Sequence, residues 1–193
     1  MDHKDSKFDF SPSELEIVCD KSFFLKKALV LNKIKDQYSR LEEAIHRTEL
    51  PGLPLEMLKR GKISQGENYL GAPWVVLDAP AFFSGKDILA FRHIFLWGLN
   101  ISSTLHVSGK HLEKVDYEAV WGLTNPDMMI LTGDDPFIHH KDISVYKPIR
   151  ELSIREMKEL KHLRISIFSE PDDWDENFEK SMRFIKEVRK IIR

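Results

Sequence analysis

The sequence has very little cysteine: Cys19 is the only one among its 193 residues. One thiol cannot form an intramolecular disulfide, and a lone cysteine is more typical of a reducing compartment than of a secreted domain. The first residues, Met1 to Asp5, are polar and mixed in charge, without the apolar core of a signal peptide. We therefore expect a cytoplasmic protein.

Long apolar runs and an excess of one charge are also missing. The densest apolar stretch, residues 94–99, is far shorter than the roughly 20 residues that a membrane-spanning helix needs. The 29 Lys and Arg nearly balance the 31 Asp and Glu, so the formal charge of -2 gives no electrostatic signature for nucleic acid or an anionic membrane. We expect neither as a partner, which leaves a protein, a small molecule or a second copy of the chain.

The common catalytic and nucleotide-binding motifs are absent as well. There is no GxxxxGK[ST] loop, no GxGxxG after a predicted strand, no HExxH and no pair of cysteines for zinc. The GxSxG sequence of α/β-hydrolases is also missing. None of these mechanisms is indicated, so any site has to be argued from individual side chains.

A strong helix signal stands near the N-terminus. Residues 11–14 combine a serine cap, a proline in the first turn and a glutamate that can close a capping box. Apolar residues then recur every seven positions from Ile17 to Ile45, with a break expected near residues 19–22 and a stop at residues 51–54. This spacing favours packing on a core over a long coiled coil.

Two more helices are predicted in the last quarter of the chain. Ser153 and Glu156 repeat the capping box and predict a helix to about Leu163. Beyond Asp172, acidic residues crowd one end of a helical segment and basic residues crowd the other, which complements the helix dipole. The apolar stripe of this last helix, expected to be buried, includes Phe178, Met182, Ile185 and Val188.

Between these helices the pattern changes to strands and turns. Strands are predicted near residues 74–78, 88–97, 101–107, 128–131 and 164–168. We interpret the second and third as a hairpin, with a helix as the alternative for residues 87–97, and residues 110–123 fit either a helix or a strand. Because the sequence lacks alternating βαβ units, we expect an α+β fold with a mostly antiparallel sheet flanked by N- and C-terminal helices. Residues 1–9 are expected to be a disordered tail, and residues 10–193 a single globular domain.

A row of polar side chains on the predicted hairpin is the most site-like feature. Ser102, Thr104 and His106 fall on one face of its second strand, and a buried polar group without a partner costs roughly 1–3 kcal/mol. The row therefore faces either solvent or a polar cavity. Arg92, on the first strand, is the expected charged companion if the register brings it to the same face. An anion would then bridge Arg92 and His106, and its binding would weaken as the pH rises through the histidine pKa.

A second group of polar residues follows the predicted strand at 128–131. Asp134, His139 and His140 supply the oxygen and nitrogen atoms that divalent metals bind, with a neighbouring carboxylate available as a base. The alternative is a hydrogen-bonded turn, because adjacent histidines on an extended segment point to opposite sides.

Asp78 and the tryptophans each have a structural and a functional interpretation. Asp78 ends an apolar strand, where polar side chains often project into clefts, but it also suits the turn that follows. Trp74 and Trp97 are expected in the core because they stand in apolar runs, whereas Trp121 fits either a core or a ligand-stacking position.

Residues 69–78, together with Phe91-Arg92 and Thr104-Leu105-His106, resemble a family of uncharacterised bacterial proteins. The resemblance covers about a quarter of the chain, contains no catalytic motif and implies no activity. The sequence therefore predicts a non-enzymatic binding or interaction protein, with a small polar or anionic molecule as one kind of ligand. The alternative is a metal-assisted or histidine-dependent hydrolase. It would use some combination of His93, His106, Asp134, His139 and His140, with Arg92 binding an anionic group.

Overall fold

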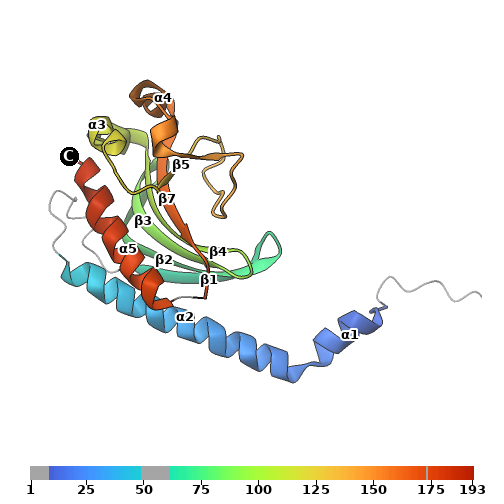
Figure 1. Ribbon diagram of the computed structural model, residues 1–193. Coiled ribbons are helices and arrows are strands. Elements are labelled where there is room, and N and C mark those ends of the chain that lie inside the picture. The colour runs from blue at the N-terminus through green and yellow to red at the C-terminus, as the bar shows by residue number, and fades with distance from the viewer. Residues whose placement is uncertain (1–8, 49–60, 173) are drawn as a thin grey trace, which may run out of the picture.

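The computed structural model describes residues 9–48, 61–172 and 174–193, and Figure 1 shows helices packed along a curved sheet. The expected tail therefore lies outside the described residues except for Asp9. The helices and strands are α1 (Pro12–Cys19), α2 (Lys21–Arg47), β1 (Lys62–Tyr69), β2 (Ala72–Ser84), β3 (Asp87–Leu96), β4 (Asn100–Ser108), α3 (Tyr117–Trp121), β5 (Met129–Leu131), β6 (Tyr146–Pro148), α4 (Ile154–Glu159), β7 (His162–Ser169) and α5 (Trp174–Val188).

The strands form one antiparallel sheet in the order β1-β2-β3-β4-β7-β5-β6. This arrangement confirms the expected α+β class with an antiparallel sheet and terminal helices. The predicted hairpin is β3 and β4, whose connection contains Gly98 at a φ of +71°, a backbone conformation that glycine adopts without a side-chain clash. Pro80 lies inside β2, where the pairing with β3 is irregular between Asp78 and Ala81, as expected for a proline in an inner strand.

Helices α2 and α5 cover one face of the sheet (Figure 1). Side chains alternate between the two faces of a strand, so every second residue of β2, β3, β4 and β7 points toward these helices. That face is mostly apolar and forms the main core with the helices that cover it; the buried side chains of this core include Leu77, Phe91, Leu105, Ile165 and Phe184. We call the opposite side of the sheet the open face.

The helix boundaries follow their capping residues. Ser11 and Glu14 form the predicted capping box of α1, and Ser153 and Glu156 form that of α4. The expected break is at Asp20, which ends α1 and whose carboxylate accepts hydrogen bonds from the first backbone amides of α2. Helix α2 ends at Arg47, and the predicted stop at residues 51–54 lies outside the described residues.

The stripe of α5 packs against the core largely as predicted. Met182, Ile185 and Val188 are buried, and Phe178 is half-buried. Basic and acidic residues also stand at the expected ends, with Asp175 and Glu176 in the first turn and Lys186 in the last.

Several elements differ from the sequence-based expectation. Strands β1 and β6 were not predicted, and α4 ends at Glu159, four residues early, because β7 already begins at His162. The ambiguous segment 110–123 is helical, with a 3-10 helix at Gly109–Lys114 followed by α3. No helix among the described residues is long and apolar enough to cross a membrane.

Candidate functional site

A row of polar side chains crosses the open face of the sheet over four strands. The register pairs Asp78 on β2 with Arg92 on β3, Arg92 with Thr104 on β4, and Thr104 with Ser166 on β7. Directly opposite residues of antiparallel strands project to the same face. His106, two residues beyond Thr104, projects to this face as well. The register therefore brings Arg92 and His106 to one side of the sheet.

The hairpin residues expected to contact a ligand are buried rather than solvent-facing. Ser102, Thr104 and His106 are each at most 5% exposed. The Thr104 hydroxyl lies 2.8 Å from the Ser166 hydroxyl, whereas the Ser102 hydroxyl has no hydrogen-bond partner among the described residues. Nine consecutive residues of β4 are buried, so this strand is covered on both faces.

Arg92 is held in place by Asp78. Its Nε lies 2.6 Å from Asp78 Oδ1 and its Nη2 lies 3.0 Å from Asp78 Oδ2, which is a bidentate ion pair. The guanidinium also lies over the Phe83 ring, 5.5 Å from its centroid. The Arg92 side chain is 21% exposed. Asp78 thus orients the guanidinium, and its Nη1 remains available for another acceptor.

Arg164 on β7 is a second guanidinium on this face, and it is 1% exposed. It donates to the carbonyls of Pro136 and Ile138, the latter at 2.9 Å, and to His139 Nδ1 at 3.1 Å. No carboxylate among the described residues forms an ion pair with it, and its Nε has no partner there. Tyr146 also donates to the Ile138 carbonyl, at 2.9 Å. Together these contacts hold the β5–β6 loop, residues 132–145, across the open face.

Two further side chains of the sheet, Tyr69 and Asn100, hold the adjoining residues 139–141 of the β5–β6 loop. The Tyr69 hydroxyl accepts a hydrogen bond from the His139 backbone amide at 2.7 Å and lies 2.8 Å from His140 Nδ1. The Asn100 side-chain oxygen accepts from the Lys141 amide at 3.0 Å. Residues of β1, β4 and β7 therefore set the position of one loop, and the loop covers part of the polar row.

His106 and His139, which lie on the open face, are neutral at physiological pH. Burial, followed by the charge of Arg164, lowers the pKa of His106 to about 3 and that of His139 to about 2. Burial also lowers the pKa of Arg164, with a further contribution from Arg92. The positive charge of this face therefore comes from the two arginines, which corrects the expectation that a protonated His106 would attract an anion.

A pocket of about 290 Å³ opens on this face beside Arg92. Its floor is apolar and consists of Trp74, Val76, Ile94 and Leu96. Its polar side is formed by Arg92, Tyr69 and His139, and Phe137 of the β5–β6 loop contributes a further apolar wall. Trp74, expected in the core, is half-buried and lines this pocket instead. The pocket thus combines an apolar floor with a guanidinium at one side.

The side chains expected to bind a metal form contacts with other side chains instead of with one another. Asp134 forms an exposed ion pair with Lys161 at 2.8 Å, His139 accepts from Arg164, and His140 contacts Tyr69. Across residues 9–48, 61–172 and 174–193, no group of three or more His, Cys, Asp or Glu side chains could hold a metal ion.

His93, named with the hydrolase alternative, lies on the helix-covered face. Its Nδ1 is 2.8 Å from the Ser103 hydroxyl, which is 2.8 Å from the Ser181 hydroxyl of α5. Burial lowers the pKa of His93 to about 3, and its Nε2 has no partner among the described residues. His93 is therefore separated by the sheet from His106 and His139, and the histidines do not gather around one cavity.

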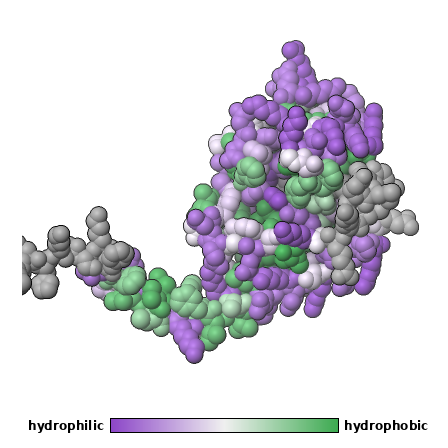
Figure 2. Space-filling view, turned by 180° about the vertical axis from the view of Figure 1, so that it is seen from behind, coloured by the Kyte–Doolittle hydropathy of each residue, from purple (hydrophilic) through white to green (hydrophobic). Residues whose placement is uncertain are grey.

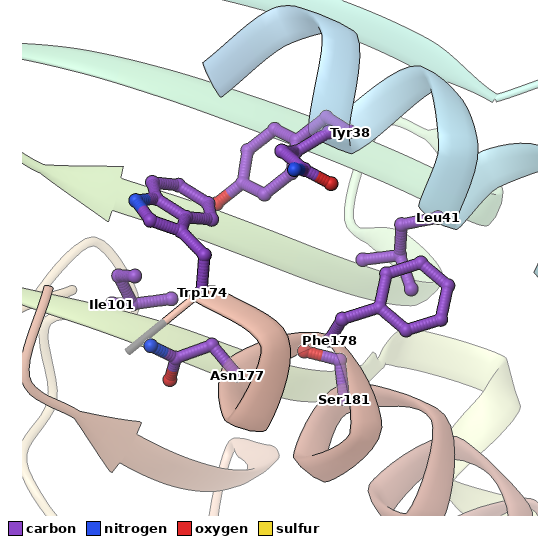
Figure 3. A pocket seen from close by; sticks show the side chains of 8 residues that line it. Tyr38, Leu41, Ile101, Trp174, Asn177, Phe178 and Ser181 are labelled. Atoms are coloured by element: carbon purple, nitrogen blue, oxygen red, sulfur yellow. The ribbon is translucent and has the colours of Figure 1, made fainter. Parts of the chain in front are cut away.

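A small cavity lies next to this network, between α2 and α5. Figure 3 shows Tyr38 and Leu41 of α2 facing Trp174, Phe178 and Ser181 of α5 across it. Its volume of about 20 Å³ is enough for about one water molecule. The Tyr38 hydroxyl has no hydrogen-bond partner among the described residues, and burial raises its pKa. This cavity is too small for an organic ligand.

Comparisons of the chain with protein-family models, with curated proteins and with solved structures find no match. The site has to be interpreted from its own geometry.

Sequence reasoning missed two residues that shape the site. Arg164 stands between Leu163 and Ile165 in a predicted strand, so the alternation argument that singled out Arg92 would have found it. Tyr69 offered no such signal, because β1 is a polar strand and the contact with His139 depends on the path of the β5–β6 loop.

Proposed function

We propose that this chain binds a small amphiphilic anion, a molecule with an apolar body and a carboxylate head, in the pocket beside Arg92. The observation that supports this proposal most directly is the pairing of an apolar floor with Arg92 at one side of the same pocket. Ligand pockets are commonly apolar with a few polar groups that fix orientation. The volume of about 290 Å³ suits a small molecule rather than a peptide.

Arg92 can bind a ligand while it stays paired with Asp78. The carboxylate of Asp78 takes the Nε and Nη2 side of the guanidinium. A guanidinium has five N–H groups, so the Nη1 side can donate to a carboxylate of the ligand. Asp78 fixes the orientation of this donor before the ligand arrives, which lowers the entropy lost on binding.

The surroundings of Arg92 favour an anion over a cation. Arg164 adds a second positive charge that no carboxylate of the described residues neutralises by an ion pair. His139 lines the pocket, and its Nδ1 accepts from Arg164, so the proton of the neutral ring is on Nε2. The pocket therefore presents hydrogen-bond donors beside a local excess of positive charge.

The test is a titration of the full-length protein with straight-chain monocarboxylates from acetate to decanoate, followed by calorimetry and tryptophan fluorescence. Each added methylene that enters the pocket should improve the affinity about fourfold, because burying a CH₂ is worth about 0.8 kcal/mol. The fluorescence change should disappear in Trp74→Phe, since Trp74 forms part of the floor.

The charged end is tested with the paired substitution Asp78→Asn and Arg92→Gln, which removes both partners of the ion pair at once. We expect at least a tenfold loss of affinity, the usual size for a hydrogen bond to a charged group. Arg150→Gln is the matched control, because Arg150 contacts Trp121 away from this pocket. Protonation of His106 and His139 should not change the affinity between pH 6 and 8, since burial keeps both rings neutral there. Equal affinities in the paired variant and the control would rule out this site.

A further inference from the structure

The N-terminal arm, residues 9–30, extends beyond the sheet (Figure 1), and much of the side seen in Figure 2 is apolar. Fifteen large apolar side chains are exposed in the described residues, and nine of them lie on this arm. These nine are Phe10, Leu15, Ile17, Val18, Phe23, Phe24, Leu25, Leu29 and Val30. Exposed apolar patches of this kind mark interaction surfaces.

The apolar stripe of α2 is covered in one half and bare in the other. Residues Leu31, Tyr38 and Ile45 are buried against the body of the protein, whereas Phe24, seven residues before Leu31, is 48% exposed. A second strip, Leu25 and Leu29, lies on the far side of the helix and is 58% and 62% exposed. A helix that is apolar on several sides needs cover on more than one of them.

The arm also divides into an acidic and a basic part. Residues 9–20 contain four acidic and no basic residues, whereas residues 21–35, which run from the arm into the next turn of α2, contain five lysines and no acidic residue. Lys27 pairs with Glu67 of β1, but no ion pair involves Lys21, Lys26 or Lys33 within the described part of the chain. Two such arms laid head to tail would place acidic residues of each beside lysines of the other.

We infer that the arm is a dimerisation surface and that its occupant is the arm of a second copy of this chain, packed antiparallel. The charge pattern favours a second arm as the occupant. Only in the head-to-tail direction do the acidic residues of each arm lie beside the lysines of the other. An isologous contact of this kind is the commonest way for identical chains to associate. An anionic lipid bilayer fits less well, because it would repel the acidic residues and cover only one side of the helix.

The size of the apolar surface is consistent with a stable contact. With about 150 Å² for a large apolar side chain, nine half-exposed ones present on the order of 700 Å². A standard interface buries about 800 Å² on each partner. The two arms therefore provide nearly enough surface for a dimer without help from the sheet.

The first experiment measures the mass of the full chain by sedimentation over about 1 to 100 µM and should show a dimer. Charge reversal on the acidic side, Asp9→Lys with Glu16→Lys, should weaken the dimer at least tenfold. Reversal on the basic side, Lys26→Glu with Lys33→Glu, should have the same effect. An equimolar mixture of the two variants should regain the dimer, because each arm then meets its complement. Failure of the mixture to associate would overturn the head-to-tail arrangement.

The second experiment tests the apolar strip and separates this proposal from a bilayer. Leu25→Ser with Leu29→Ser should weaken the dimer at least tenfold without unfolding the protein, since both side chains are exposed. Ile143→Ser, at a residue 81% exposed on the β5–β6 loop, is the matched control and should leave the mass unchanged. A monomer at 100 µM would overturn the proposal, and monomers that co-sediment with phosphatidylserine vesicles would assign the arm to membranes instead.

Discussion

The two faces of the sheet are built from alternate residues of the same strands, yet they differ in cover and chemistry. On β4, Ile101 and Leu105 pack under α2 and α5. Thr104 and His106, on alternate positions of the same strand, project to the open face with Arg92 and Arg164. The cavity between α2 and α5 on the helix-covered face measures about 20 Å³, whereas the pocket beside Arg92 on the open face measures about 290 Å³. A single strand thus presents mostly apolar side chains to the helices and a polar row to the opposite face.

The largest expected contrast between the faces is in packing. Ile185→Ala, on the helix-covered face, should lower the free energy of unfolding by about 2–5 kcal/mol, because the side chain is 1% exposed and its cavity cannot collapse fully. Ile94→Ala, on the open face, should cost less than about 2 kcal/mol, because it enlarges an existing pocket that water can enter. Urea unfolding measures both. Equal losses would mean that the open face is as tightly packed as the core.

Lowering the pH should reduce the free energy of unfolding by an intermediate amount per residue, because buried histidines with a lowered pKa occur on both faces. In the unfolded chain each takes up a proton near pH 6.5, whereas the folded pKa is about 3 for His93 and His106 and about 2 for His139. The unfolded state then binds more protons, so stability is complete above about pH 6.5 and falls as the pH drops toward 3. At pH 5 the loss should be about 2 kcal/mol for each histidine.

Variants that cannot titrate show which face is responsible. Urea unfolding at pH 7 and pH 5 should give a smaller difference for His93→Asn than for the native chain, and the same for His106→Asn. Burial lowers the pKa of His93, whereas at His106 the charges of Arg164 and Arg92 lower the pKa further. A pH difference that neither substitution reduces would show that these imidazoles are protonated in the folded protein.

The smallest contrast compares two neighbouring serines of β4. Ser103→Ala should cost about 1–2 kcal/mol, because it leaves His93 Nδ1 and the Ser181 hydroxyl without a partner on the helix-covered face. Ser102→Ala should change stability by less than about 0.5 kcal/mol, because the Ser102 hydroxyl makes no hydrogen bond within the described residues. If Ser102→Ala proved the more costly change, that hydroxyl would have a partner in solution.

Local sequence signals predicted the elements that local interactions control. The capping boxes at Ser11 and Ser153, the break at Asp20 and the hairpin around Gly98 each depend on a few adjacent residues. Strand β1 escaped prediction because Lys62–Tyr69 is a polar strand at the edge of the sheet, without the apolar alternation of an inner strand. The three residues of β6 are too few to show any period.

The candidate site was only half predictable for a related reason. Arg92 and His106 lie on adjacent strands of one hairpin, so their common face depends on a short connection. The pairing of β4 with β7 joins residues 62 positions apart, as for Thr104 and Ser166, and no local pattern specifies it. Arg164 and the β5–β6 loop enter the site only through that pairing, which is why the pocket itself was not foreseen.

The place of β4 in the sheet also has a consequence for the growing chain on the ribosome. Until β7 is made, β4 is the last strand of a four-strand meander and pairs only with β3. At about 5–20 residues per second, the synthesis of β7 follows on the order of 3–12 s later. An open edge can recruit other unfinished chains and seed aggregates. This edge strand is more polar than a run of leucines would be, because it carries the side chains of Ser102, Thr104 and His106. The polar row of β4 therefore makes the incomplete sheet less prone to aggregate than a strand of aliphatic side chains would.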